Sequence, residues 1–107
     1  MKSNEEHSAE FQQLALWSKS IGHPTRLNIL RALADKGGWV EGEIIHVQGV
    51  FPSTIIQHLR ELKRAGIIQG RIFGAQCKYG LNGEILQEFH KSWTSIMEKI
   101  IKASTNA

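Results

Sequence analysis

The sequence predicts a small, mainly α-helical domain of the α+β class, with about five helices and a two-stranded β-hairpin. Apolar residues recur at helical spacing in several stretches of the chain. Two strand-like runs, IIQGRIF and QCKYGL, are separated only by Gly74 and Ala75. With 107 residues, of which 41% are hydrophobic, the chain can bury one core, so we expect residues 1–107 to form a single domain.

Composition narrows the class of protein. The formal charge of +3 and the pI of about 9.3 suit a polyanionic partner without requiring one. We expect a cytoplasmic protein, because no apolar run approaches the roughly 20 residues that cross a membrane and the N-terminus is polar. An enzyme is not expected, because paired carboxylates, a nucleophile with its base and a glycine-rich phosphate loop are not apparent.

The first helix is predicted from about Glu5 to Ser20, with residues 1–8 as a frayed tail. Phe11 and Leu14 lie on one side of this helix, and Trp17 lies on another. Two interpretations of these apolar faces stay open. Either the helix is shared between the domain and a second subunit, or it is an ordinary core helix.

A second helix is predicted from His23 to about Lys36, because Gly22 breaks the first helix and a glycine pair follows Lys36. Its expected inner stripe consists of Leu27, Leu30 and Ala34, widened by Ile29 and Leu33. A short strand at Trp39 and Val40 should follow.

Next, a brief helix is predicted from Glu41 to Gln48, and Gly49 should form the turn into the following helix. The residues of the brief helix that are expected to face inward are Ile44, Ile45 and Val47.

The stretch from Phe51 to Ile68 predicts an amphipathic helix over residues 52–65, begun by Pro52 and ended before Gly66. A rotation of about 100° per residue places three apolar residues within about 40° of one another. These are Ile55, Leu59 and Leu62. The opposite side is polar and mostly basic, with Ser53, Gln57, Arg60, Glu61 and Arg64. Such a helix docks on a core while its outer face stays available to a partner.

Two short helices joined by a glycine-containing turn, the second with a polar outer face, are typical of a helix-turn-helix. The hairpin that follows, Ile67–Phe73 and Gln76–Leu81, bears Arg71 and Lys78. A basic hairpin in this position is typical of the wing of a winged helix, whose tip can reach a phosphate backbone or a minor groove. A small solvated hairpin with scattered charges is the alternative for this stretch taken alone.

A final helix is predicted from Gly83 to about Ala103, capped by Asn82. Its apolar residues recur every three or four positions and are Leu86, Phe89, Trp93, Ile96, Met97 and Ile100. So long a stripe exceeds what a peripheral helix of a small domain needs, and the same helix of a second copy would bury it. His90 lies within the stripe and is expected to be an interface histidine rather than a ligand or a pH switch.

Three segments resemble the ArsR-like (arsenical-repressor) family of winged-helix transcription regulators. They are WSKSIGHPTRLNILRAL from Trp17 to Leu33, STIIQHLRELKRAGII from Ser53 to Ile68, and the basic hairpin that closes in KYGLN. The similarity covers about Leu14 to His90. It implies a homodimer, held by its first and last helices, that sets two copies of helix 52–65 into successive major grooves of a palindromic operator. Such proteins are usually repressors.

The resemblance also implies which residues meet DNA and which meet the second copy. The DNA contacts are Ser53, Thr54, Gln57, Arg60 and Arg64 of the helix and Arg71, Gln76 and Lys78 of the wing 69–81, with His58 packing nearby or touching a phosphate. Gln pairs bidentately with adenine, and Arg pairs with guanine or phosphate. The dimer interface combines Phe11, Leu14, Trp17, Leu86, Phe89, His90, Trp93, Ile96, Met97 and Ile100.

Two departures from the family pattern affect which operator is read. Ile56 stands where a small hydroxyl residue is common, so base reading there either becomes a contact with a thymine methyl or is lost. Phe51 replaces the usual N-capping Ser, which leaves the helix start less well satisfied. These two apolar residues also favour an alternative function, a winged helix that binds another protein and not specific DNA.

A third departure concerns ligands. The cysteine pair of the metal sensors is missing between Val40 and Val47, and His90 has no second His at the spacing that other sensors use in the last helix. Cys77 is the only cysteine, so it is expected to be a packed residue rather than a redox switch. We therefore expect no metal or other cofactor, and the sequence contains no motif for an inducer.

Overall fold

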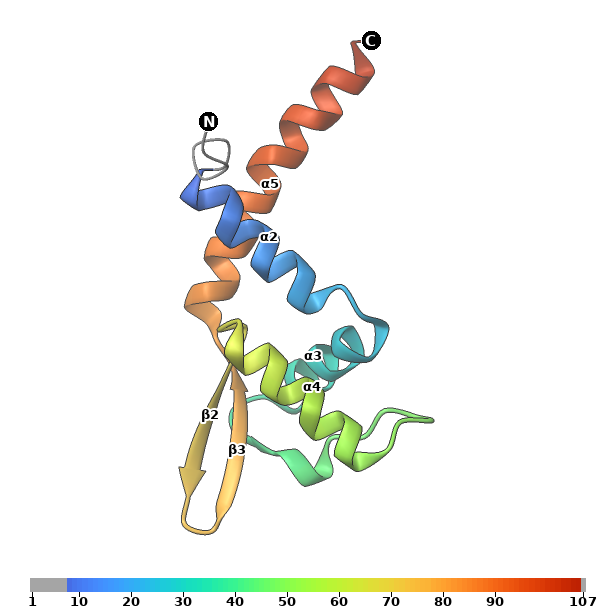
Figure 1. Cartoon of the computed structure of the whole chain (residues 1–107), viewed down its shortest axis with the longest axis vertical. Helices are drawn as coiled ribbons and strands as arrows, with labels where there is room; N and C mark the ends of the chain where they lie inside the picture. The colour runs from blue at the N-terminus through green and yellow to red at the C-terminus, as the bar shows by residue number, and fades with distance from the viewer. Residues whose placement is uncertain (1–7, 107) are drawn as a thin grey trace, which may run out of the picture.

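The computed structural model describes residues 8–106 (Figure 1). The elements in chain order are α2 (Ala9–Ile21), α3 (Pro24–Lys36), β1 (Val40–Glu41), the 3₁₀ helix η1 (Gly42–Ile44), α4 (Pro52–Arg64), β2 (Ile68–Phe73), β3 (Gln76–Leu81) and α5 (Gly83–Thr105). The mainly α, α+β class is confirmed. Residues 8–106 form four α-helices and η1 where about five helices were predicted. The three strands are the two of the predicted hairpin and the short strand predicted near Val40.

The ends of α4 lie where the sequence predicted them. Pro52 occupies the first helical position, where its missing N–H costs no hydrogen bond. At the other end Gly66 adopts φ +82°, and its N–H donates to the Lys63 carbonyl at 2.9 Å. The N–H of Ile67 donates to the Leu62 carbonyl at 3.0 Å. These two bonds form a Schellman motif, whose left-handed position glycine adopts without strain.

The core lies where α3, α4 and the sheet meet. The predicted stripe of α4 is confirmed, because Ile55, Leu59 and Leu62 are at most 2% exposed. The predicted stripe of α3 is wrong in part. Ile29 and Leu33 are buried in a helix that packs against α4 and β3, whereas Leu27 is 52% exposed and Ala34 is exposed as well. The buried face of α3 is thus centred on Ile29 and Leu33 and not on the predicted stripe.

The brief helix predicted from Glu41 to Gln48 is wrong. Only Gly42–Ile44 is helical, as one 3₁₀ turn without a side-chain cap, and Glu41 instead pairs with β3. Glycine and β-branched residues, both poor helix formers, are frequent in this segment. Ile45 is buried as predicted, but Ile44 is 46% exposed.

The predicted hairpin is confirmed, and it belongs to a larger sheet than expected. The antiparallel strand order is β1-β3-β2. Phe73 pairs with Gln76 across a two-residue turn in which Gly74 has φ +62°, the pattern of a type II′ turn. The strand predicted at Trp39 and Val40 begins one residue later, and its Val40 pairs with Tyr79 of β3.

The two helices at the chain ends pack against each other. Ser8 is the N-cap of α2, and its Oγ accepts a hydrogen bond from the Phe11 N–H at 3.1 Å. Ser8, which was predicted to belong to a frayed tail, is thus a helix cap. Residues 1–7, including the predicted helix start at Glu5, lie outside the described residues. α5 continues past α2 and contributes to the elongated shape, 52 × 32 × 24 Å (Figure 1).

Candidate nucleic-acid interface

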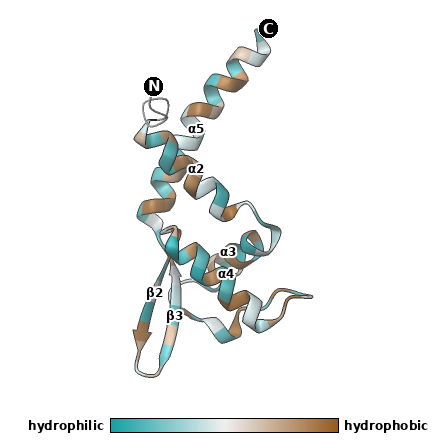
Figure 2. Ribbon diagram, in the orientation of Figure 1, coloured by the Kyte–Doolittle hydropathy of each residue, from teal (hydrophilic) through white to brown (hydrophobic). Residues whose placement is uncertain are grey.

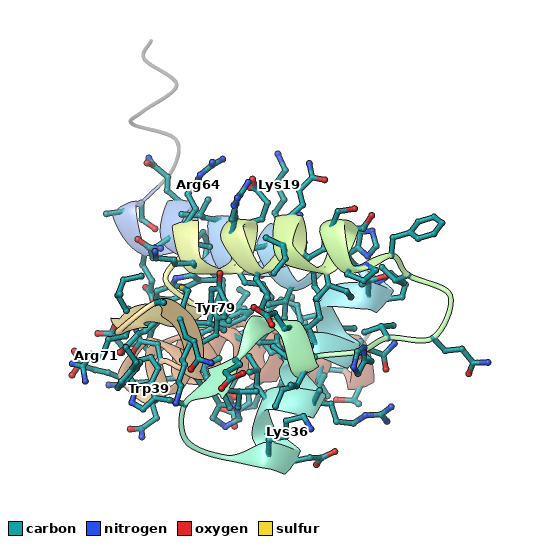
Figure 3. The ribbon with its side chains drawn as sticks, turned by 90° about the horizontal axis from the view of Figure 1, so that it is seen from below. Lys19, Lys36, Trp39, Arg64, Arg71 and Tyr79 are labelled. Carbon is teal, nitrogen blue, oxygen red and sulfur yellow. The ribbon has the colours of Figure 1, made fainter. Side chains whose placement is uncertain are left out.

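α4 presents a polar face to solvent opposite its buried stripe. Ser53, Gln57, Arg60 and Arg64 are exposed, and Thr54 is half-buried. In Figure 3 the Arg64 side chain projects outward from α4, away from Tyr79 and the core. The helix thus offers hydroxyl, amide and guanidinium groups, which can hydrogen-bond base edges and phosphates in a major groove.

Phe51 and Ile56, the two apolar residues that depart from the family pattern, differ in how far they are buried. Phe51 is the N-cap residue, supplies no side-chain cap and is 78% exposed. Ile56 is half-buried and packs against the core, with its Cδ1 3.2 Å from where a Cβ on Gly42 would lie. Ile56 therefore faces inward, which favours the loss of base reading at that position over a thymine-methyl contact.

His58 takes part in a contact between α3 and α4. Arg26 donates from Nε to His58 Nδ1 at 3.0 Å and from Nη1 to the Ser20 carbonyl at 2.9 Å. The His23 ring centroid lies 4.5 Å from that of His58, and His23 Nδ1 caps α3 by accepting from the Thr25 N–H at 3.1 Å. Burial, then the nearby His23 and Arg26, lower the pKa of His58 from its usual value. A neutral His58 is the form that can accept from Arg26.

The wing places two cations on two aromatic rings. Arg71 lies 5.1 Å from the Trp39 ring centroid, and Lys78 Nζ lies 5.0 Å from that of Phe73. Figure 3 shows Arg71 and Trp39 near each other at one edge of the molecule. Arg71 and Lys78 are paired across β2 and β3, where like charges repel, and the cation–π contacts offset this repulsion. Gln76 is exposed beside the hairpin turn.

Arg64 is paired with Glu61 on the same helix. Its Nη1 lies 3.1 Å from Glu61 Oε2, and the two side chains are 76% and 38% exposed. Such an exposed pair contributes only about 0–1 kcal/mol. The Arg64 guanidinium can therefore leave Glu61 for a phosphate at little cost.

Sequence reasoning missed three residues that support these groups. Arg26 lies 32 residues from His58 along the chain, so no local pattern connects them. Trp39 reaches Arg71 only because β1 joins the sheet beside β3. Phe73 could have been found, since an aromatic residue in a basic hairpin is a candidate cation–π partner.

The residues predicted for a dimer interface fall into two groups. Leu14, Trp17 and Phe89 are buried within this chain, and the rings of Trp17 and Phe89 are 5.6 Å apart. The others are half-buried or exposed and comprise Phe11, Leu86, His90, Trp93, Ile96, Met97 and Ile100. For the Leu14 and Trp17 side of α2, the structure thus favours the interpretation of an ordinary core helix.

The second group leaves an apolar surface on α5. A groove of about 540 Å³ lies between α2, α3 and α5, and its lining includes Leu27, Leu86 and Trp93. Figure 2 shows hydrophobic residues recurring along α5 beyond its contact with α2.

Two further findings concern metals and membranes. Among residues 8–106, no group of three or more His, Cys, Asp and Glu side chains is arranged to hold a metal ion. Cys77 is half-buried against the core. In the same part of the chain, no helix has both the length and the hydropathy for a bilayer crossing.

Comparison with known proteins agrees with this geometry. The model of the arsR family of bacterial regulatory proteins matches residues 23–69. An HTH-type transcriptional regulator of Methanocaldococcus jannaschii is 34% identical over 82 residues, 77% of this chain and 92% of that protein.

Solved structures share the fold. An ArsR-like transcriptional regulator from Rhodococcus sp. RHA1 has a TM-score of 0.75 at 18% identity, over 92% of each chain. A homodimeric winged helix-turn-helix DNA-binding domain from Mycobacterium bovis, described as a possible ArsR-family regulator, has a TM-score of 0.66 at 25% identity. That match covers 94% of this chain and 91% of the other.

The fold and the comparisons thus define a transcriptional regulator with a winged helix-turn-helix DNA-binding domain. The chain belongs to the arsR family of bacterial regulatory proteins. The resemblance found in the sequence is therefore confirmed.

Proposed function

We propose that this chain is a cytoplasmic, homodimeric repressor that binds a palindromic operator, with residues 1–107 acting as one domain. The observation that carries the proposal is the exposed polar face of α4 on the same small domain as a basic wing. Helix 52–65 enters the major groove, and the wing 69–81 contacts the flanking backbone or minor groove.

Within this proposal the exposed side chains have distinct roles. Gln57 reads adenine, and Arg60 reads guanine or contacts a phosphate. Ser53 and Thr54 bind near the helix N-terminus, which favours an anionic oxygen. The remaining backbone contacts come from Arg64, Arg71, Gln76 and Lys78. His58 supports α4 through its bond to Arg26 and does not meet DNA itself.

Dimerisation buries the part of the predicted interface that is free in one chain. Phe11, Trp93 and Ile100 are 49%, 47% and 53% exposed, and Ile96 and Met97 beside them are half-buried. A two-fold axis through this surface makes the contact self-complementary and closes the assembly at two copies. It also relates the two α4 helices by the symmetry of a palindrome.

Selection of bound sequences from a random duplex library at near-physiological salt, with the protein's mass recorded in solution, tests the proposal. We expect an enriched inverted repeat with half-sites about one helical turn, or 34–36 Å, apart, and a dimeric mass. A reporter gene placed behind that repeat then gives the sign of regulation, which we expect to be repression.

A protein-interaction module is the second candidate. It is favoured by the exposure of two large apolar residues near the DNA-facing elements, Phe51 at 78% and Ile72 at 70%. Large exposed apolar groups often mark protein contacts. If no sequence is enriched and DNA binding is only weak and salt-sensitive, this candidate replaces the first.

A further inference from the structure

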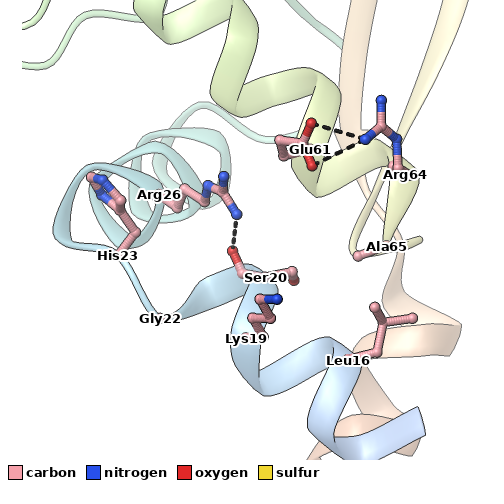
Figure 4. A pocket seen from close by; sticks show the side chains of 9 residues that line it. All are labelled: Leu16, Lys19, Ser20, Gly22, His23, Arg26, Glu61, Arg64 and Ala65. Atoms are coloured by element: carbon pink, nitrogen blue, oxygen red, sulfur yellow. Dashed lines mark hydrogen bonds and ion pairs between the residues drawn. The ribbon is translucent and has the colours of Figure 1, made fainter. Parts of the chain in front are cut away.

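A basic pocket of about 460 Å³ lies beside α4, where the end of α2 and the start of α3 approach its second half (Figure 4). Its charged lining comes from all three helices: Lys19 from α2, Arg26 from α3, and Glu61 and Arg64 from α4. Figure 4 shows Arg26 reaching the backbone of Ser20, while Arg64 is bonded to Glu61.

The charges in this pocket are unbalanced. Glu61 and Arg64 form an ion pair with each other. Lys19 and Arg26 have no carboxylate partner anywhere between residues 8 and 106, and Arg26 is half-buried. Removing a guanidinium from water without a counter-ion costs free energy. The pocket therefore favours an anion.

The Arg26 guanidinium is also held in a fixed orientation. Its two hydrogen bonds go to neutral acceptors, His58 Nδ1 at 3.0 Å and the Ser20 carbonyl at 2.9 Å. Neither bond neutralises its charge, and further N–H groups of the guanidinium are not used by them. A guanidinium presents these N–H groups as a rigid fork that matches an oxyanion, and a preset orientation lowers the entropy lost on binding.

We propose that this pocket binds a phosphate-type oxyanion, held by Arg26 and Lys19 and by Arg64 when it leaves Glu61. The anion can come from two sources, a phosphodiester of the DNA backbone or a free anion of the phosphate class. The first source rests on the proposed function, and the second does not. Glu61 and Arg64 belong to α4, the helix that is proposed to read DNA. When an anion binds, Arg64 of this helix exchanges Glu61 for the anion.

The free anion is tested on the protein without DNA. Inorganic phosphate is titrated against chloride at constant ionic strength, while the NMR signals of the Ser20 and Arg26 amides and the His58 ring are followed. We expect saturable shifts that need about tenfold more phosphate in Arg26→Gln and Lys19→Gln, because each loses a charge-assisted hydrogen bond. Lys36→Gln is the matched control, since Lys36 projects from the opposite side of the molecule (Figure 3). It should leave the titration unchanged.

The DNA source is tested with the same variants on random-sequence duplex. If a phosphodiester occupies the pocket, Arg26→Gln and Lys19→Gln each lower the slope of log affinity against log salt by about 0.9, while Lys36→Gln does not. Lys19→Gln keeps both bonds of Arg26, so it stays informative if Arg26→Gln proves unstable on thermal unfolding.

The outcomes separate the two proposals. A wild-type protein that does not bind DNA overturns the proposed function, while the phosphate titration still decides the pocket. Variants that match Lys36→Gln in both experiments overturn the oxyanion site. An effect in only one experiment identifies the source of the anion.

Discussion

α4 and α5 are both amphipathic helices, but among residues 8–106 only the apolar face of α4 is covered. In α4, Leu59 and Leu62 are 0% exposed, and the opposite face is left polar. In α5 only Phe89 is buried, while Trp93 and Ile100 stay about half exposed at 47% and 53%. An apolar stripe at helical spacing thus predicts that a face is suited to burial, but it does not tell which surface covers it.

The largest effect should come from the buried face of α4. Leu59→Ala should lower the free energy of unfolding by about 2–5 kcal/mol, because the cavity cannot fully collapse in a packed core. Ile100→Ala on α5, tested at concentrations where the protein is monomeric, should cost less than about 0.5 kcal/mol. Urea unfolding measures both values. Equal losses would remove the contrast between the two helices.

A charged residue in the exposed apolar stripe of α5 tests whether this stripe forms the dimer interface. Trp93→Glu should give monomers and weaken operator binding by about a hundredfold or more, because a carboxylate opposes burial and the gain from linking two half-sites is lost. Sedimentation and a binding titration measure the two effects. Trp93→Phe should preserve the dimer. A dimeric Trp93→Glu protein, or a monomeric wild type, would contradict the assigned surface.

The outer face of α4 should determine sequence preference. Gln57→Ala should relax the preference at one base pair of each half-site by about 1–3 kcal/mol, since a bidentate contact with adenine is lost. Binding to the selected operator and to single-base variants of it gives this value. The assigned role fails if affinity drops equally for operator and random DNA.

The wing should contribute to DNA affinity but not to sequence preference. Lys78→Ala should weaken binding to all duplexes and lower the salt slope by about one unit, because one phosphate contact disappears. Titrations from 50 to about 200 mM salt, with Lys99→Ala on α5 as the control, measure the slope. An unchanged slope would exclude Lys78 from the interface.

The smallest effect should be a pH dependence of stability at the α3–α4 contact. Burial, then His23 and Arg26, lower the pKa of His58 from its usual 6.5. As the pH falls through about 6.5, the unfolded chain takes up a proton that the folded chain resists, so the free energy of unfolding decreases. At lower pH, where folded His58 is protonated too, this loss levels off.

A glutamine in place of His58 isolates this contribution. His58→Gln keeps an acceptor for Arg26 but does not titrate, so denaturation curves between pH 7.5 and about pH 5 should show a smaller loss of stability. His46→Gln, at an exposed loop position, is the control and should behave as the wild type. If both variants follow the wild-type pH dependence, His58 does not contribute to it.

Local chemistry explains which elements could be predicted. Pro52 and Gly66 delimit α4 through their own backbone properties, and the α4 stripe follows from helical periodicity alone. Gly74 at φ +62° likewise sets the hairpin turn. The helix predicted from Glu41 to Gln48 is wrong because Glu41 pairs with β3, a strand that lies far from it in the sequence.

The residues of the site likewise divide into those that the sequence predicted and those that only the structure brought together. The sequence placed Gln57 and Arg60 opposite the buried stripe, because the helix geometry relates the two faces. It did not connect Arg26 with His58, nor Trp39 with Arg71, because each pair meets only through packing between separate elements.

By itself, the sequence determined the bounds and polarity of α4 and the hairpin, since each depends on residues within one or two turns of chain. The order of these elements, together with the family resemblance, indicated the winged helix-turn-helix class. Only the tertiary structure decided that Ile56 faces the core and that Leu14, Trp17 and Phe89 are buried within this chain. It also decided that Arg26 joins three helices beside a basic pocket. The reason is that burial and hydrogen bonding depend on which surfaces meet, and periodicity specifies a face of an element but not its neighbour.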